Sequence, residues 1–205
     1  MTAQRSSLRQ PDITRSRLLD CAYTEFHQRG FRAASLDSIL IKAGVTKGAL
    51  YHHFANKSAL GYAVVDELIQ PFMQSYWLPL TTAEDPIECA IAGIKKRRDK
   101  LKQHLLAYGC PFNNLTQEMS PIDEGFRTRL QGILDEWRHT LAAAFERGKA
   151  SGKVRVDVNT PAAAIFFISA FEGLIGMGKA SQSSVLYEQG LRGLVEYLER
   201  LRPAA

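Results

Sequence analysis

Apolar residues recur every three to four positions along most of the chain, which is the spacing of one face of an α-helix. Breaks marked by glycine, proline or a capping residue divide this pattern into separate segments. One short run, residues 154–158, alternates between apolar and polar side chains. It lies between two helical segments and is predicted to be a loop. The pattern therefore predicts an all-α protein.

The first 60 residues predict three helices and the start of a fourth. Residues 13–29 carry apolar side chains on one face and end at Gly30. Ser35 can cap a short helix that Gly44 ends, because glycine readily adopts the left-handed backbone of a tight helix exit. Thr46 can cap the next helix almost immediately. Two short helices joined by so tight a turn form a helix-turn-helix unit.

The remaining chain predicts a longer helical body. Residues 56–80 begin as a helix, and a kink is expected near Pro71 because proline lacks a backbone donor. Three later helices are expected to start where a capping residue precedes a proline. These starts are Asp85 with Pro86, Ser120 with Pro121, and Thr160 with Pro161. The helices they begin are expected to end near residues 108, 150 and 180. A short helix at 111–119 and a final one at 184–202 complete the prediction.

The second helix of the helix-turn-helix unit presents a polar face suited to DNA. Lys47, Tyr51, His52 and His53 point away from the apolar side. Such side chains bind phosphates and base edges. Lys57 falls in the first turn of the next helix, where free backbone N–H groups also attract phosphate. An ordinary helical hairpin with a polar face is the alternative.

The distribution of charge favours the DNA-binding interpretation. Residues 1–60 contain nine Lys and Arg against four Asp and Glu, whereas residues 61–205 contain seventeen of each. The whole net charge of +5 therefore lies in the part that carries the helix-turn-helix unit. A basic module on a neutral body is the electrostatic pattern of a nucleic-acid-binding protein. It argues against a purely structural helical dimer.

The first quarter of the chain resembles the amino-terminal domain of TetR-family (tetracycline-repressor-like) transcriptional regulators. The matching positions are Thr14, Arg15, Leu18, Leu19, Ala22, Phe26, Gly30, Phe31, Ser35, Leu36, Ile39, Ala43, Gly44, Val45, Thr46, Gly48, Leu50, Tyr51, His53, Phe54, Lys57 and Leu60. Leu40 departs from the pattern, since the family commonly has alanine there, and this change concerns packing. The resemblance implies a DNA-binding domain at residues 1–60. It also implies a helical effector-binding and dimerisation domain at residues 61–205.

The same resemblance implies a dimeric, ligand-responsive repressor that reads a palindromic operator in double-stranded DNA. Carried over position by position, the implied DNA contacts are Ser35, Thr46, Lys47, Gly48, Tyr51, His52, His53 and Lys57. Lys47 is predicted to read bases. Phosphate contacts are expected from Ser35, Thr46, Tyr51 and Lys57.

The last two predicted helices favour self-association. Residues 162–180 are apolar nearly all round, and residues 184–202 carry an apolar stripe, which together exceed what the body needs for its own core. The resemblance implies that these helices pair with their mates as a four-helix dimer interface. The predicted interface residues are Leu174, Leu191, Leu194, Val195 and Leu198. The apolar run 162–171 is interrupted by Glu172 and is too short to span a bilayer, so no membrane partner is expected.

Arg98 falls on the apolar stripe of the helix that starts at Pro86. An arginine in that position either pairs with a carboxylate in the core or provides a cationic contact for an acidic ligand. The neighbouring basic residues are predicted to form a solvated face. They are Lys95, Lys96, Arg97, Lys100 and Lys102.

The body more weakly resembles a subgroup of TetR-family regulators, several of which respond to reactive carbonyls, other electrophiles or oxidants. The shared positions are Gly109, Cys110, Asn114, Leu115, Glu118, Glu172, Gly173 and Lys179. Cys110 is therefore a candidate sensor, since a helix start and a nearby cation such as Arg98 or Lys179 would lower its thiol pKa. Alternatively, Cys110 is a small buried side chain and the effector binds reversibly. The candidate effector residues are Arg98, Cys110, Phe112, Trp137, Phe167, Phe171, Glu172 and Lys179.

Three widely spaced cysteines suggest reduced thiols in a cytoplasm rather than disulfides or a zinc site. His52 and His53 are adjacent and so point about 100° apart on a helix, and neither a metal nor a cofactor is expected. The first ten residues are polar and basic without an apolar core. They are predicted to be a mobile arm rather than a signal peptide.

An enzyme is the rival functional class. Cys110 would be the nucleophile and His104 or His139 the base. Against this, the sequence has no glycine-rich phosphate loop, paired-carboxylate motif or metal-ligand spacing. No catalytic residue is therefore assigned.

Overall fold

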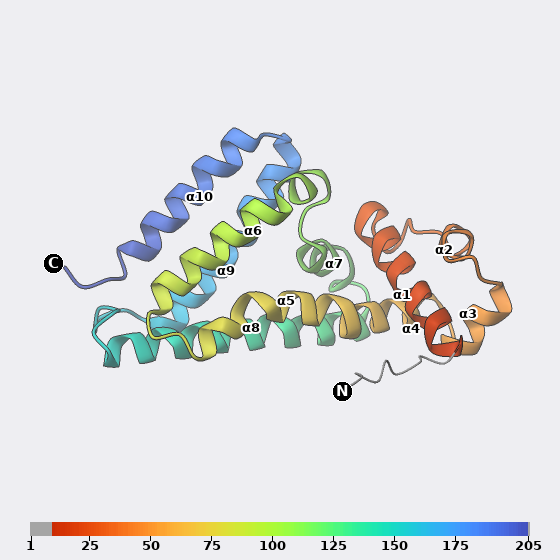
Figure 1. Cartoon of the computed structure of the whole chain (residues 1–205), viewed down its shortest axis with the longest axis horizontal. Coiled ribbons are helices and arrows are strands. Elements are labelled where there is room, and N and C mark those ends of the chain that lie inside the picture. Colours follow the sequence, from red (N-terminus) through yellow and green to blue (C-terminus); the bar gives the residue numbers. More distant parts are fainter. Residues whose placement is uncertain (1–9, 205) are drawn as a thin grey trace, which may run out of the picture.

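A computed structural model describes residues 10–204, and it describes the side chains of residues 12–99 and 103–204. Over this part the chain is helical and contains no strand, which confirms the all-α prediction (Figure 1). The α-helices are α1 (Gln10–Arg29), α2 (Leu36–Ala43), α3 (Lys47–His53), α4 (Lys57–Val64), α5 (Gln70–Trp77), α6 (Pro86–Tyr108), α7 (Pro111–Met119), α8 (Glu124–Ala150), α9 (Thr160–Ser181) and α10 (Ser184–Glu199). The predicted amino-terminal arm lies, except for Gln10, outside the described residues.

We call α1–α4 the head, and its short helices are fixed by their caps. Ser35 Oγ accepts a hydrogen bond from the Ser38 amide at 3.3 Å, and Thr46 Oγ1 accepts one from the Ala49 amide at 3.2 Å. Gly44 ends α2 with a φ of 65°, a left-handed conformation that favours glycine. The helix-turn-helix unit therefore forms where the sequence places it.

We call the elements from residue 65 onward the body. A nearly continuous helical rod runs from the head into the body. It consists of α4, a π-helical turn η1 (Val65–Ile69), α5, and a 3-10 turn η2 (Leu78–Thr81). Pro71, near which the sequence predicts a kink, lies in the first turn of α5, and the π-turn ends immediately before this helix. Proline is tolerated there, because the first turn needs no intrahelical donor from that residue.

Two helix starts in the body differ from the prediction by one to three residues. The cap of α8 is Asp123 rather than Ser120, because Ser120 keeps helical backbone angles at the end of α7, while Asp123 is extended and accepts from the Phe126 amide. The cap of α9 is Asn159, which accepts from the Ala162 amide. Thr160 instead donates its hydroxyl to Glu146 at 2.5 Å.

The core of the body lies between α6, α8, α9 and α10, with α7 between α6 and the head (Figure 1). By length and composition α9 could cross a membrane. In the structure it packs against α6, α8 and α10 and buries nine of its residues, so it is a core helix. Residues 154–158 form a loop, as predicted.

Candidate functional site

The polar face of α3 is exposed at the end of the molecule that lies farthest from α10 (Figure 1). Lys47 and His52 are exposed, and Tyr51 exposes 46% of its surface despite its size. Leu50 is fully buried and packs the opposite face of α3 against the core of the head. The exposed set also includes Ser35, Thr46 and Gly48, whereas His53 is half-buried beside the His52 ring.

Lys57 differs from the exposed lysine of α3. Its Nζ donates hydrogen bonds to the carbonyl oxygens of Ala34 at 2.6 Å and Arg32 at 3.2 Å, and it lies 4.9 Å from the centre of the Phe31 ring. Burial lowers its pKa. The ammonium thus holds the loop between α1 and α2, a role that the helix-start position alone did not predict.

The buried arginine of α6 is Arg97, and the prediction of Arg98 was wrong by one residue. Arg97 is 1% exposed, whereas the Arg98 side chain is 36% exposed and pairs with Asp99 and Glu188. A step of 3.6 residues from buried Ile94 falls between the two arginines, so periodicity alone could not choose. The expected solvated basic face therefore does not include Arg97.

Arg97 lies among aromatic rings and polar groups from α5, α9 and the residue before α7. Its guanidinium carbon is 4.4 Å from the Tyr76 ring centre and 5.0 Å from that of Phe171. Nη2 donates to Cys110 Sγ at 3.3 Å, and Nη1 lies 3.8 Å from Glu172 Oε1. Nε and Nη1 of Arg97 and both carboxylate oxygens of Glu172 have no hydrogen-bond partner. A buried cation is thus held at the centre of the body with incomplete hydrogen bonding.

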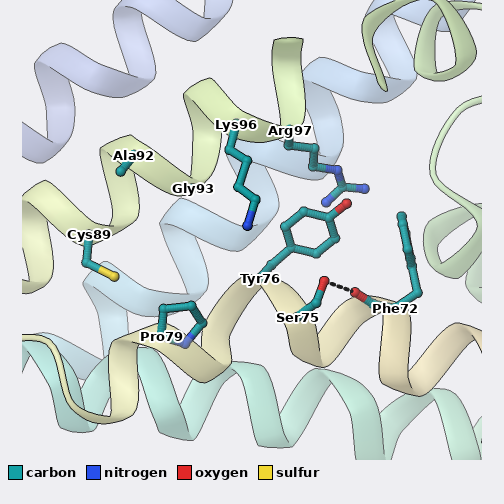
Figure 2. Close-up of a pocket in the computed structure, with 9 residues that line it drawn as sticks. All are labelled: Phe72, Ser75, Tyr76, Pro79, Cys89, Ala92, Gly93, Lys96 and Arg97. Atoms are coloured by element: carbon teal, nitrogen blue, oxygen red, sulfur yellow. Dashed lines mark hydrogen bonds between the residues drawn. The ribbon is translucent and has the colours of Figure 1, made fainter. Parts of the chain in front are cut away.

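A cavity of about 410 Å³ opens beside this arginine, between the α5–η2 segment and α6 (Figure 2). Its volume lies within the range of small-molecule sites, roughly 300–1,000 Å³. Its lining residues are Phe72, Ser75, Tyr76, Pro79, Cys89, Ala92, Gly93, Lys96 and Arg97. In Figure 2 the Lys96 side chain extends from α6 towards α5, and the Tyr76 ring reaches up to the Arg97 guanidinium. The lining contains two cations and no carboxylate.

Most residues predicted for the effector site lie near this cavity rather than in its wall. Trp137, Phe167 and Phe171 line an adjoining space of only about 20 Å³, together with Tyr76 and Gly93. Phe112 is buried in the core. Lys179 contacts Asn114 on α7. The wall residues of α5 were missed because Phe72 and Tyr76 belong to a segment whose pattern indicated only a connecting helix.

Cys110 does not have the lowered thiol pKa that a sensor role would require, and its burial agrees with the alternative of a small buried side chain. The side chain is 1% exposed, and burial raises its pKa to about 12, with the Glu172 carboxylate acting in the same direction. The Arg97 guanidinium opposes this rise but does not overcome it. The thiol is therefore protonated at neutral pH, and the nucleophilic thiolate is scarce.

The histidines proposed as a base for Cys110 have other contacts. His104 Nε2 lies 3.2 Å from His27 Nδ1, and His139 Nε2 lies 3.0 Å from Arg138 Nη2. No cysteine–histidine pair forms in the described part of the chain. Over the same residues, no group of three or more metal-ligating side chains comes together.

The predicted dimer-interface leucines of α10 are mostly internal. Leu191, Leu194 and Leu198 are buried between α10 and its neighbours within one chain, because the apolar stripe of α10 faces α6 and α9. Leu174 and Val195 are partly buried against the same core. The exposed apolar side chains of this region lie on other faces of the two helices. They are Ile165, Phe166, Met177, Val185 and Leu186.

Among the polar contacts between the head and the body, two involve main-chain atoms. The Glu118 carboxylate on α7 accepts hydrogen bonds from the backbone amides of Phe31 and Arg32, both at 2.8 Å. His27 Nε2 donates to the Gly109 carbonyl at 2.9 Å. In the neutral ring, Nδ1 then accepts from His104. We call these two contacts the head–body junction.

Comparison with known proteins gives the family context of these features. Residues 18–64 match the model of bacterial regulatory proteins of the tetR family, and residues 91–194 match that of the tetracyclin repressor-like C-terminal domain. Transcriptional regulator AcuR of Cereibacter sphaeroides is 30% identical over 72% of this chain and 68% of its own length. HTH-type transcriptional repressor DhaR of a Mycobacterium species is 26% identical over 90% of this chain and 91% of its own. The crystal structure of a TetR-family regulator from Cytophaga hutchinsonii superposes with a TM-score of 0.86 at 19% identity, covering 98% of this chain and all of that one.

Proposed function

The chain belongs to the tetR family of bacterial regulatory proteins, and from this premise we propose that it is a homodimeric repressor in the cytoplasm. It binds a palindromic operator in double-stranded DNA and releases it when a small molecule occupies the helical body. The observation that carries the proposal is the exposed polar face of α3, on a capped helix at one end of the molecule.

The chemistry of that face supports a division of labour on DNA. Lys47, exposed in the first turn of α3, reads base edges in the major groove. Tyr51 and the caps Thr46 and Ser35 hold phosphates, which fixes the register of the helix. His52 and His53 complete the contact surface. Gly48 has no side chain, which lets the DNA backbone come close to α3. Lys57 acts indirectly by supporting the loop between α1 and α2.

A dimer through α9 and α10 explains the apolar surface that one chain leaves exposed. Phe166 is 54% and Met177 is 67% exposed. The Phe166 ring lies 4.6 Å from that of Tyr197, which joins the surfaces of the two helices. A second copy related by a two-fold axis would cover this face and place two α3 helices for a palindromic site.

The effector binds reversibly in the cavity beside Arg97 rather than reacting with Cys110. A thiol with its pKa raised to about 12 and almost no exposed surface is a poor nucleophile. The alternative, an electrophile or oxidant sensed at Cys110, is tested by treating operator-bound parent protein and Cys110→Ser with hypochlorite, quinones and small aldehydes. We expect both to respond equally. Release confined to the parent would restore Cys110 as the sensor.

Selection of operator fragments from random DNA, followed by gel shift and footprinting, tests the proposed function. We expect a protected palindrome bound by two copies of the chain. A matched sample with α3 altered at Lys47 and Tyr51 to Ala controls for non-specific binding by the basic head. No selective enrichment of any sequence would overturn the proposal.

A further inference from the structure

We propose that the cavity between α5 and α6 binds a small organic carboxylate with an apolar body, its anionic group held by Arg97 and Lys96. This inference rests on the proposed ligand response and names the chemical class of the effector.

Two nitrogen atoms of Arg97, Nε and Nη1, have no hydrogen-bond partner. Its guanidinium is buried, yet only Nη2 donates a hydrogen bond, and the acceptor is a thiol, which is a weak one. Buried donors without acceptors are costly, so nearly all of them are paired in folded proteins. A carboxylate oxygen is a strong acceptor for a guanidinium, and either of the two free nitrogens could donate one charge-assisted hydrogen bond to it.

The lining of the cavity is positively charged. Glu172 forms a loose ion pair with Arg97, its Oε1 lying 3.8 Å from Nη1, which is too far for a hydrogen bond between the two. Burial raises its pKa. Lys96 adds a second cation to the cavity and forms no ion pair with any described residue. Two cations in a partly enclosed space favour an anionic ligand.

The walls of the cavity are largely apolar, which favours an anion that carries an apolar body. Phe72, Tyr76 and Pro79 present apolar surface from the α5–η2 segment, opposite the small residues Ala92 and Gly93 of α6 (Figure 2). An inorganic phosphate has no apolar part to pack against these walls. A monocarboxylate with an aromatic or short aliphatic body satisfies both the charge and the walls.

Ligand binding would bear directly on α7. The Arg97 side chain has no exposed surface, so the Tyr76 ring beside it must shift before an anion reaches the guanidinium. That guanidinium holds Cys110, the residue before α7, and Glu118 near the other end of α7 holds the head. A carboxylate that draws the guanidinium away from Cys110 would loosen the start of α7. This gives the bound anion a physical route to the DNA-binding head.

Matched pairs of probes test the charge requirement. Benzoate, phenylacetate and hexanoate are compared with benzamide, phenylacetamide and hexanamide, which have nearly the same shape without charge. Calorimetry and thermal shift on the full chain measure binding, and gel shift measures operator release. We expect at least one acid to bind and release DNA, and each amide to bind about tenfold to 100-fold more weakly than its acid. Equal binding of acids and amides, or no binding by any acid at millimolar concentration, would overturn the proposal.

Variants of neighbouring arginines test the assignment of the anion to Arg97. Arg97→Gln should weaken acid binding about tenfold or more, Lys96→Gln should weaken it by less, and Arg98→Gln should leave it unchanged. If Arg97→Gln does not fold, Arg97→Lys and Lys96→Gln replace it. Acid binding within twofold of the parent in both of those replacements would overturn the proposal.

A cavity-filling variant separates this inference from the proposed function. Gly93 lines the cavity and an added Cβ meets no atom within 4 Å, so Gly93→Leu should fill the space and abolish acid binding while operator binding persists. Gly132→Leu, on the exposed side of α8 with equally free space, is its control. If neutral probes release DNA through this cavity, the repressor function stands and the carboxylate inference fails. If the ligand-free protein selects no operator, the proposed function itself fails.

Discussion

Two lysines of the head, ten residues apart in the chain, have opposite surroundings. Lys47 is exposed in the first turn of α3, while the Lys57 ammonium is bound to two carbonyl oxygens of the loop before α2. An exposed lysine contributes to DNA binding through contacts made only in the complex. A lysine that closes a loop contributes through the shape of the free protein.

Replacement of Lys47 by Ala should therefore weaken operator binding by about 1–3 kcal/mol, with relaxed preference at the base it reads. Melting temperature should stay near that of the parent, because the side chain makes no internal contact that the fold needs. Gel shifts on matched operator variants at fixed salt provide the measurement. Lys153→Ala, an exposed lysine of the body, is the control. Parent-like affinity in Lys47→Ala would show that another residue reads the bases.

His27 gives the head–body junction a dependence on pH. Burial lowers the His27 pKa from 6.5 to about 4, and the nearby His104 and Lys179 act in the same direction, while the Gly109 carbonyl opposes them. An unfolded chain binds a proton at this residue near pH 6.5, whereas the folded chain does so only near pH 4. Stability is therefore lost as the pH falls through this window, by about 3 kcal/mol at most.

The expected result is a steeper loss of unfolding free energy between pH 6.5 and 4 in the parent than in His27→Gln. Urea unfolding at a series of pH values measures the two slopes. The difference between the proteins isolates His27 from the carboxylates that also titrate in acid. Parallel slopes would mean that His27 is as easily protonated in the folded chain as in the unfolded one.

At the level of elements, α7 connects the effector cavity to the head. Its start at Cys110 receives the Arg97 hydrogen bond, and its last turn carries Glu118, which holds two amides of the head. The two contacts lie at opposite ends of one short helix. A displacement at the cavity end of a rigid helix must appear at the other end.

Replacement of Glu118 by Gln should uncouple effector binding from DNA release. The amide keeps one acceptor oxygen but loses the charge that strengthens both hydrogen bonds, and we expect a loss of about 1–3 kcal/mol in stability. Effector affinity measured by calorimetry should be unchanged, while the effector concentration for operator release rises. Glu124→Gln, an exposed carboxylate of the first turn of α8, serves as control. Unaltered release by the Glu118 variant would place the coupling in the rod instead.

Local signals allowed the helices to be predicted, and contacts between distant segments decided the remainder. The caps Ser35, Thr46 and Asp85 act within their own turn, so their role is readable from neighbouring residues. The choice of Arg97 over Arg98 depends on Cys110 and Glu172, which lie 13 and 75 positions away. The cavity wall on α5 likewise depends on how the rod packs against α6.

The same reason explains why the leucines of α10 that were predicted for the dimer interface are buried within one chain. A stripe of leucines on α10 is apolar whether it faces its own chain or another copy, and Leu194 faces its own. The sequence predicts self-association because the last two helices carry more apolar surface than the core of one chain needs. Which residues remain exposed depends on the packing of α9 and α10 against α6.

The whole molecule is polarised, with the basic helix-turn-helix unit at one end and exposed apolar side chains on α9 and α10 towards the other (Figure 1). In the proposed dimer each end is incomplete alone, because one α3 would read only half of a palindromic operator. Two half-sites bound together gain affinity through effective concentration.

A charge in the exposed apolar face of α9 and α10 should disrupt the proposed dimer and weaken operator binding as a result. Phe166→Glu is expected to convert the dimer to a monomer that stays folded, and to weaken operator binding at least 100-fold. Val156→Glu, at a still more exposed position in the loop before α9, should do neither, while Leu194→Glu should unfold the body. Sedimentation, circular dichroism and gel shift distinguish these outcomes. A dimer that survives Phe166→Glu would place the interface on another face.

The head–body junction has a consequence for how such a regulator can change its target. Glu118 binds the backbone amides of Phe31 and Arg32, and His27 binds the carbonyl of Gly109, so each half recognises main-chain atoms of the other. None of these groups lies on α3. Its exposed residues can therefore be exchanged for those of another operator-reading helix without disturbing the connection to the cavity. The ligand and the genes that it controls are, in this architecture, independently interchangeable.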